Sequence, residues 1–291
     1  MPYTRDKARR AQCRQLLDLS IHDLTPLLDS AGQLHLDTPD PAQQLFQALL
    51  QLCLFSRKRE HPFDRMCGRA FPDLLWYYGR VLPHPDRLVL RLTCAARVAR
   101  YLLPTLTTPP NQPAELTGIP GLRLEEVTRR SLVLRHLPTG GLLEIRDQSQ
   151  QLDWCDLQIL DEYDPRRQLL KNALRTTPAE DAFAHYWAPT PCTALRSALI
   201  TRGHLWWRAF QHEAATDVSH RPGGLYRIRW SKGYRTNDVG ELLTASSIAI
   251  PGAIYRPAAR SGDAGVLQLG DALVELDGPH TAEEDQWDED D

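Results

Sequence analysis

Residues 190–235 read TPCTALRSALITRGHLWWRAFQHEAATDVSHRPGGLYRIRWSKGYR, and no other stretch of the chain combines so many indoles, histidines and positive charges. Thr190 can cap a helix whose first residue, Pro191, has no N–H to leave unsatisfied. Apolar residues then recur at roughly helical spacing as far as Phe210. The pattern predicts one long amphipathic helix with a bend at Gly203.

A strand is predicted after this helix. The Pro-Gly-Gly turn at residues 222–224 leads into residues 225–231, in which apolar and polar side chains alternate. Because side chains of a strand point alternately to its two faces, the apolar residues share one face and Arg227 and Arg229 share the other. One face therefore suits a core, and the other is cationic.

Cationic and aromatic side chains cluster along this strand and its flanks, as a nucleic-acid surface requires. Arg and Lys neutralise phosphates and release counterions, and exposed rings stack on bases. The candidate nucleic-acid-binding residues are Arg208, Arg227, Arg229, Lys232, Tyr234 and Arg235. The same alternation also describes the solvated face of an ordinary amphipathic strand, and the sequence leaves both interpretations open.

The order of helix, glycine-rich turn and basic strand resembles the end of a winged helix-turn-helix. In this comparison residues 193–208 are the recognition region and the strand is the wing. The resemblance favours DNA over RNA as the nucleic acid.

Histidines and carboxylates also gather in this region, and they are the best candidates for metal or acid–base chemistry: His204, His212, Glu213, Asp217 and His220. If the helix continues, Glu213, Asp217 and His220 share one face at i, i+4, i+7 spacing. The H-E-x-x-H zinc motif, however, requires a second histidine where Thr216 stands. We therefore assign no metal site, no cofactor and no catalytic residue.

The composition is that of a globular protein with one large domain or two ordinary ones, since 42% of the 291 residues are hydrophobic. No apolar run approaches the roughly 18 to 20 residues that cross a bilayer, and the basic N-terminus lacks the apolar core of a secretory signal. We therefore expect a cytoplasmic protein with no membrane partner. The six cysteines form no C-x-x-C pair and are expected to be reduced core thiols.

The net charge of −3 hides a division along the chain. Residues 263–291 contain 11 acidic and no basic residues, whereas the preceding chain holds 34 cations against 26 carboxylates and so carries +8. Residues 279–291 form an acidic tail that we expect to be disordered. The body of the protein is therefore basic.

The first 103 residues are predicted to form an all-helical domain. The expected helices cover 5–28 (as one helix, or as two joined near Ser20), 41–55, 63–81 and 85–103, and the Asp40-Pro41 pair marks the start of the helix at 41–55. Residues 104–121 follow as a proline-rich linker, with four prolines between 104 and 113 that cannot continue a helix. We place a domain boundary in this linker.

Residues 122–278 are predicted to form an α+β domain. A β-hairpin is expected from 131–137 and 142–147, with a further strand at 156–160. Proline-containing helix starts follow at Asp164-Pro165, Thr177-Pro178 and Thr190-Pro191, and further strands are expected at 242–250 and 266–276.

The predicted fold class is thus α+β, with a helical N-terminal half before a mixed C-terminal half of short antiparallel strands that resembles a winged helix. The leading hypothesis is a bacterial or phage protein that binds nucleic acid without catalysis, in replication, transcription, a mobile element or defence. One alternative is a subunit of a larger complex whose helical half docks on a protein partner. Another is a hydrolase or nuclease that uses the 204–220 cluster.

Overall fold

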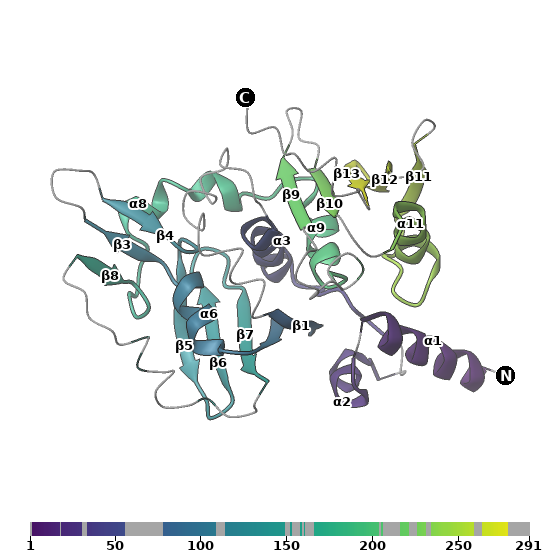
Figure 1. Ribbon diagram of the computed structural model, residues 1–291, viewed down its shortest axis with the longest axis horizontal. Coiled ribbons are helices and arrows are strands. Elements are labelled where there is room, and N and C mark those ends of the chain that lie inside the picture. Colours follow the sequence, from purple (N-terminus) through teal and green to yellow (C-terminus); the bar gives the residue numbers. More distant parts are fainter. Residues whose placement is uncertain are drawn as a thin grey trace. The chain divides into compact units, whose positions relative to one another are not determined.

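The protein is described from a computed structural model, in which the described residues are 2–17, 19–30, 34–55, 78–108, 114–148, 152, 158, 160, 166–203, 205, 216–220, 226–230, 234–258 and 264–278 (Figure 1). Its helices and its three antiparallel or mixed sheets confirm the α+β class. The chain divides into two compact units. The first unit combines Met1–His35 with Arg202–Asp291, and the second is the continuous stretch Leu36–Thr201.

A five-stranded sheet, here called sheet 1, organises the second unit. Its strands are β1 (Tyr78–Pro83), β2 (Leu88–Leu92), β5 (Leu122–Val127), β6 (Ser131–His136) and β7 (Leu142–Asp147). Their order in space is β1-β2-β7-β6-β5, and β2 and β7 run parallel while the other neighbours run antiparallel. The hairpin of β6 and β7 confirms the hairpin expected from the sequence.

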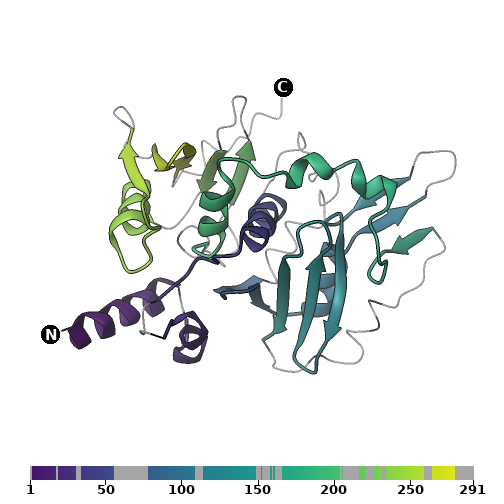
Figure 2. The same cartoon turned by 180° about the vertical axis from the view of Figure 1, so that it is seen from behind.

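One face of sheet 1 is apolar and is covered by helix α6 (Ala95–Leu102) (Figures 1 and 2). The helix packs with five fully buried apolar residues against a face whose leucines are also fully buried. Asp147, at the end of β7, accepts the N–H of Ala95 at 3.2 Å and so caps the helix. Because Arg146 is the neighbour of Asp147 in the strand, its side chain belongs to the opposite face.

Helix α3 (Pro41–Phe55) packs against helix α9 (Thr193–Ile200) within the second unit. The predicted start of α3 is confirmed, since the carboxylate of Asp40 accepts the N–H of Ala42 at 3.0 Å. The side-chain amide of Gln43 bonds to both the N–H (2.7 Å) and the C=O (3.0 Å) of Leu142. The Gln43 amide therefore makes the pair of hydrogen bonds that a residue of a neighbouring strand would make, and it joins α3 to β7.

An aromatic stack adds to this contact. The Phe46 ring lies parallel to the buried ring of His136 with centroids 5.2 Å apart, and Trp187 meets His136 edge-on at 5.4 Å. Gly141 makes room for Phe46, because a Cβ at that position would come within 2.4 Å of the Phe46 Cβ. The stack thus fixes the tip of the β6–β7 hairpin against α3.

The rest of the second unit is a small sheet and two short helices. The sheet has the order β4-β3-β8 and consists of β3 (Thr105–Thr107), β4 (Glu115–Thr117) and β8 (Arg167–Leu169), while the helices are α8 (Pro178–Asp181) and η2 (Ala184–Trp187). The helix start predicted at Thr177-Pro178 is confirmed, and Thr177 and Glu180 form a capping box there. Its Glu180 is fully buried and forms a two-bond ion pair with Arg123, with both N–O distances 2.8 Å.

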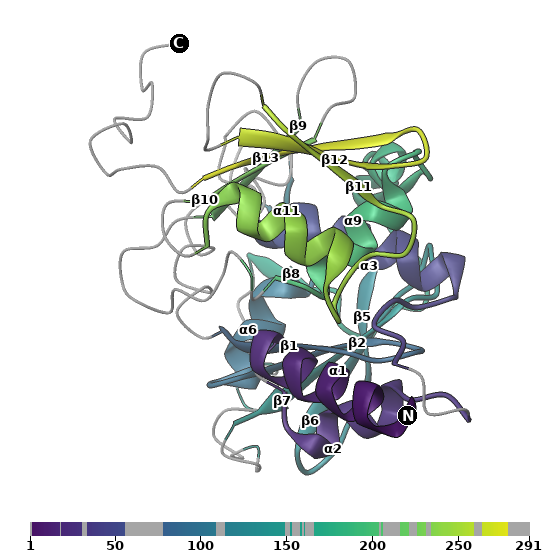
Figure 3. The same ribbon diagram turned by 90° about the vertical axis from the view of Figure 1, so that its right-hand side faces the viewer.

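The first unit is built around a second five-stranded sheet, sheet 2. Its order is β11-β12-β13-β10-β9, with β9 (Thr216–His220), β10 (Tyr226–Trp230), β11 (Ile254–Pro257), β12 (Ala264–Leu269) and β13 (Ala272–Asp277). Helix α11 (Thr236–Ala245) lies along one face of the sheet (Figure 3). Gly240 and Gly265 receive the Tyr255 ring, which leaves no room for a Cβ at either position.

Helices from the start of the chain complete the first unit: α1 (Pro2–Leu17), α2 (Ile21–Leu24) and the 3₁₀ helix η1 (Thr25–Leu27). Gln12 accepts the N–H of Ser247 at 3.4 Å, and Cys13 and Leu17 of α1 are buried. The buried guanidinium of Arg202 donates to the carbonyl of Ile248 at 2.6 Å. The two separated stretches of the chain therefore share one core.

The described cysteines agree with the sequence analysis. Cys13, Cys53, Cys94 and Cys192 are in the reduced thiol state, and three of them are buried. Burial raises the pKa of the Cys13 thiol to about 11, although the positive charges of Arg202 and Arg9 pull it in the opposite direction. This thiol is therefore protonated and unreactive at neutral pH.

Two of the helices predicted in the first 103 residues are wrong in part. Strand β1 lies where the end of the 63–81 helix was expected. Strand β2 lies where the first half of the 85–103 helix was expected, and only the second half of that segment is helical, as α6. The expected helix at 63–77 lies outside the described residues. Because β2 pairs with β7, strands from both sides of the prolines at 104–113 join one sheet, and these prolines do not separate a helical half from a mixed half.

Other elements differ further along the chain. The helix expected from Thr190 to Phe210 begins at Thr193 and ends at Ile200, after which the chain turns. Residues 242–245 belong to α11 instead of a strand. The hairpin of β12 and β13 confirms strand structure at 266–276. Of the expected strand at 156–160, only 158 and 160 are described, and they are helical and in a turn, respectively. The helix start at 164–165 and the acidic tail at 279–291 lie outside the described residues. No helix in the described ranges has the length and apolar character of a membrane span.

Candidate nucleic-acid interface

The predicted basic strand exists as β10, and its side chains alternate as expected. Tyr226, Ile228 and Trp230 are buried, and Arg227 and Arg229 are partly exposed. The strand lies inside sheet 2, antiparallel to β9 and parallel to β13.

Carboxylates of β13 face the two arginines of β10. Arg227 is in register with Glu275, and the two make a two-pronged ion pair with both N–O distances 2.8 Å. Arg229 is in register with Asp277 and contacts it at 3.4 Å. The charge of this face is therefore largely balanced within the sheet, which the local sequence of β10 cannot reveal.

Of the remaining predicted residues, the structure describes Tyr234 and Arg235. The Tyr234 carbonyl accepts the indole N–H of Trp230 at 2.9 Å. Arg235 is exposed at the residue before α11. Arg208 and Lys232 lie outside the described residues.

The comparison with a winged helix-turn-helix does not hold in this arrangement. Strands β9 and β10 do form an antiparallel hairpin, but β10 also pairs with β13 inside a larger sheet. Helix α9 ends at Ile200 and belongs to the second unit, whereas the hairpin belongs to the first. A recognition helix and a wing within one compact unit are therefore not present in the described part of the chain.

The part of the 204–220 cluster that the structure describes also differs from the prediction, because it is not helical. Asp217 and His220 belong to strand β9 and not to a helix. The shared helical face on which the cluster depended is therefore wrong for these two residues. His204, His212 and Glu213 lie outside the described residues, and the described ranges contain no group of three His, Cys, Asp or Glu side chains arranged to hold a metal.

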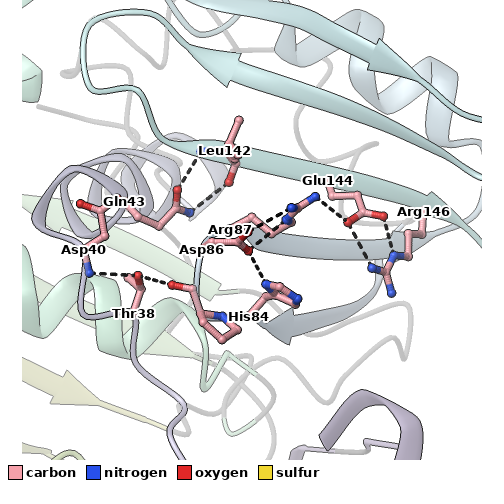
Figure 4. Close-up of polar contacts among 10 residues, drawn as sticks. Thr38, Asp40, Gln43, His84, Asp86, Arg87, Leu142, Glu144 and Arg146 are labelled. Atoms are coloured by element: carbon pink, nitrogen blue, oxygen red, sulfur yellow. Dashed lines mark hydrogen bonds and ion pairs between the residues drawn. The ribbon is translucent and has the colours of Figure 1, made fainter. Parts of the chain in front are cut away.

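The sequence analysis missed a chain of ionic contacts on sheet 1 (Figure 4). Asp86 contacts His84 and makes two hydrogen bonds with Arg87, both 3.1 Å long. Arg87 then approaches Glu144 at 3.5 Å, and Glu144 holds Arg146 with two bonds of 2.7 and 3.1 Å. In Figure 4 the two arginines lie on either side of the Glu144 carboxylate.

The electrostatics of this chain keep its carboxylates ionised. The hydrogen bond from Arg87 is the main reason that the pKa of Asp86 falls to about 2. Burial alone would raise the pKa of Glu144, but the hydrogen bond and charge of Arg146, with a contribution from Arg87, bring it below its ordinary value. Both acids are therefore charged at neutral pH.

Three arginines lie side by side on the face of sheet 1 that is opposite α6. Arg80 of β1 is in register with Arg91 of β2, which is in register with Arg146 of β7. We call these three residues the arginine row. Each is partly exposed, and Arg80 and Arg91 each take part in a further interaction. The sequence analysis missed the row because it predicted helix where β1 and β2 form.

Comparison of the chain with known protein families, with curated proteins and with solved structures finds no match.

Proposed function

We propose that the protein binds the phosphate backbone of nucleic acid, with DNA preferred to RNA, and that it does so without catalysing a reaction. The observation that supports this proposal most directly is helix α1. Its 16 residues (PYTRDKARRAQCRQLL) include five Lys or Arg and a single Asp. Such a density of cations suits contact with phosphates and the release of their counterions.

The orientation of α1 agrees with this role. Cys13 and Leu17 are buried, whereas Lys7 and Arg14 are exposed. The spacing of Lys7, Arg10 and Arg14 at i, i+3, i+7 places these three cations on one face of the helix. This face offers phosphates more positive charge than β10 does, because Glu275 and Asp277 offset the arginines of β10.

The test is a salt titration of binding to single- and double-stranded DNA and RNA, between roughly 50 and 200 mM salt. For duplex DNA, removing two phosphate contacts should lower the slope of log affinity against log salt by about 1.8. We expect this loss for Lys7→Gln with Arg14→Gln. The matched double variant, Arg227→Gln with Arg229→Gln, changes the charge equally and should cost less.

Two results would contradict the proposal at different levels. Failure of the wild-type protein to bind any of the four nucleic acids at 50 mM salt would overturn the function. A loss confined to the Arg227 and Arg229 variant would keep the function and move the interface to β10.

A further inference from the structure

The acidic tail, residues 279–291, follows β13 and belongs to the same unit as the basic helix α1. It reads PHTAEEDQWDEDD, and so it holds seven carboxylates and no Lys or Arg. Helix α1 holds five Lys or Arg and one Asp. Exposed charges of opposite sign attract each other most strongly at low ionic strength. One unit of the chain therefore contains both a group of cations and a segment of complementary charge.

The described residues place the start of the tail near α1. Gly278, which precedes the tail, accepts the N–H of Thr236 at 3.1 Å and donates its own N–H to the Thr236 hydroxyl at 3.0 Å. Thr236 is the first residue of α11, and Ser247, just after the other end of α11, donates its N–H to Gln12 of α1 at 3.4 Å. The ten residues of α11 are about 15 Å long, so Gly278 lies within roughly 35 Å of Gln12.

The tail is long enough to cover this distance. Its 13 residues span about 45 Å when fully extended. The carboxylates begin at Glu283 and continue to Asp291, so they occupy the outer part of this reach. Tethering at this range gives the carboxylates an effective concentration at α1 on the order of millimolar. A nucleic acid free in solution at a lower concentration has to compete with them.

Three exposed cations of α1 can receive these carboxylates: Lys7, Arg9 and Arg14. In the described part of the chain no carboxylate forms an ion pair with any of the three. Arg14 donates from Nε to the carbonyl of Leu19 at 3.4 Å, which leaves its charge without a counterion there. The arginines of β10, in contrast, already bond to carboxylates of β13. Helix α1 therefore attracts the tail more strongly than β10 does.

We infer that the exposed cations of α1 bind the acidic tail of the same chain, and that the tail competes there with phosphates. The docking of the tail follows from its charge and its reach. The competition with phosphates rests on the proposed function of α1. Because the contacts are between exposed charges, salt screens them, and the tail restrains binding mainly at low ionic strength.

Zero-length cross-linking of the full chain tests the docking. A carbodiimide joins a lysine amine to a carboxylate in contact with it, and the chain contains four lysines: Lys7, Lys58, Lys171 and Lys232. At 50 mM salt we expect mass spectrometry of the cross-linked monomer to find the tail peptide joined mainly to Lys7. At 200 mM salt this product should fall by about fivefold.

A pair of variants tests which cations hold the tail. Arg9→Gln with Arg14→Gln keeps Lys7 as the cross-linking site and should reduce the Lys7 product by about threefold at low salt, as the loss of two exposed ion pairs predicts. The matched control is Arg129→Gln with Arg130→Gln, which removes two exposed arginines of the second unit and should leave the product unchanged. If the α1 variant does not fold, the salt series of the wild type decides.

Removal of the tail tests the competition. A chain that ends at Gly278 should bind duplex DNA about fivefold more tightly than the full chain at 50 mM salt. At 200 mM salt the two affinities should be equal, because the contacts of the tail are screened. The truncated chain should therefore show the steeper dependence of affinity on salt.

The possible failures are distinguishable. A Lys7 product that is absent, or that neither salt nor the α1 variant reduces, would overturn the inference, and DNA binding by the full chain would leave the proposed function standing. Docking of the tail with equal DNA affinities of the full and truncated chains would overturn the competition. A salt-sensitive Lys7 product in a chain that binds no DNA, with or without the tail, would support the docking and contradict the proposed function.

Discussion

At the scale of the residue, the buried side chain of His136 makes the stability of the fold depend on pH. Its Nε2 donates to the Pro120 carbonyl at 3.0 Å, because that oxygen can only accept, and its Nδ1 lies 2.9 Å from the Thr139 hydroxyl. Burial is the main reason that its pKa falls from 6.5 to about 4. The folded protein therefore holds a neutral imidazole.

This depressed pKa predicts a loss of stability in mild acid. As the pH falls below 6.5, His136 becomes protonated in the unfolded chain, whereas in the folded chain it stays neutral until about pH 4. The free energy of unfolding therefore decreases as the pH falls from 6.5 to about 4. The contribution of His136 should be on the order of 2 to 3 kcal/mol between pH 7 and pH 4.5. Urea unfolding of the wild type and of His136→Gln at both pH values measures it.

Other acids also titrate in this interval, so the difference between the two proteins is the informative quantity. We expect the wild type to lose more stability on acidification than His136→Gln does. The exposed His22, changed to Gln, is the control for removing an imidazole. The same pH dependence in the wild type and in His136→Gln would show that His136 is not the titrating group.

At the scale of the element, the buried glutamines of α3 should differ in their effect on stability. Gln43 satisfies both polar groups of Leu142, whereas the Gln51 Oε1 atom is buried and has no hydrogen-bond partner among the described residues. A buried group without a partner costs about 1 to 3 kcal/mol, and an apolar replacement of similar shape can recover part of this cost. Gln51→Met should therefore stabilise the protein by about 1 kcal/mol.

Gln43→Met is the matched change on the same helix. It should destabilise the protein by about 1 to 3 kcal/mol, because it leaves both Leu142 groups in a partly buried site without a partner. Thermal and urea unfolding of the two variants give the comparison. Equal effects of the two substitutions would contradict this account of the helix.

The elements that could be predicted from the sequence are those whose signals are local. The capping side chain of Asp40, the capping box at Thr177 and the alternation of β10 depend on residues that are neighbours in the chain. The α+β class follows from such signals. The end of the helix at Ile200 was not predicted, although Gly203, where a bend was predicted, lies in the turn that follows it.

The wrong predictions concern strands and sites whose structure depends on residues far away in the chain. Strand β2 reads LVLRL, and an apolar run of this length fits a helix as well as a strand until β7 is placed beside it. The arginine row consequently could not be foreseen. In β10 the alternation of the arginines with apolar residues was predicted correctly, but Glu275 and Asp277, which pair with them, lie about 48 residues further along the chain.

At the scale of the whole molecule, the two units should differ in their ability to fold alone. The second unit, Leu36–Thr201, is continuous and contains its own sheets and the paired helices α3 and α9. We expect this fragment to unfold cooperatively. Circular dichroism and thermal unfolding of the fragment test this expectation, and a fragment without a cooperative transition would contradict it.

The complementary fragment, 202–291, is the control. It lacks α1, whose Cys13 and Leu17 are buried in the first unit and whose Gln12 bonds to Ser247. Removing that helix exposes part of the core, so this fragment should show no cooperative transition. Adding residues 1–35 as a separate peptide should restore one.

The discontinuous first unit has a consequence for synthesis on the ribosome. Helix α1 leaves the ribosome long before the partners that bury it, because Leu36–Thr201 must be translated in between. At 5 to 20 residues per second this delay lasts roughly 10 to 30 s. During that time the second unit can fold. The basic helix α1 is meanwhile exposed near ribosomal RNA, and its apolar side chains are not yet buried.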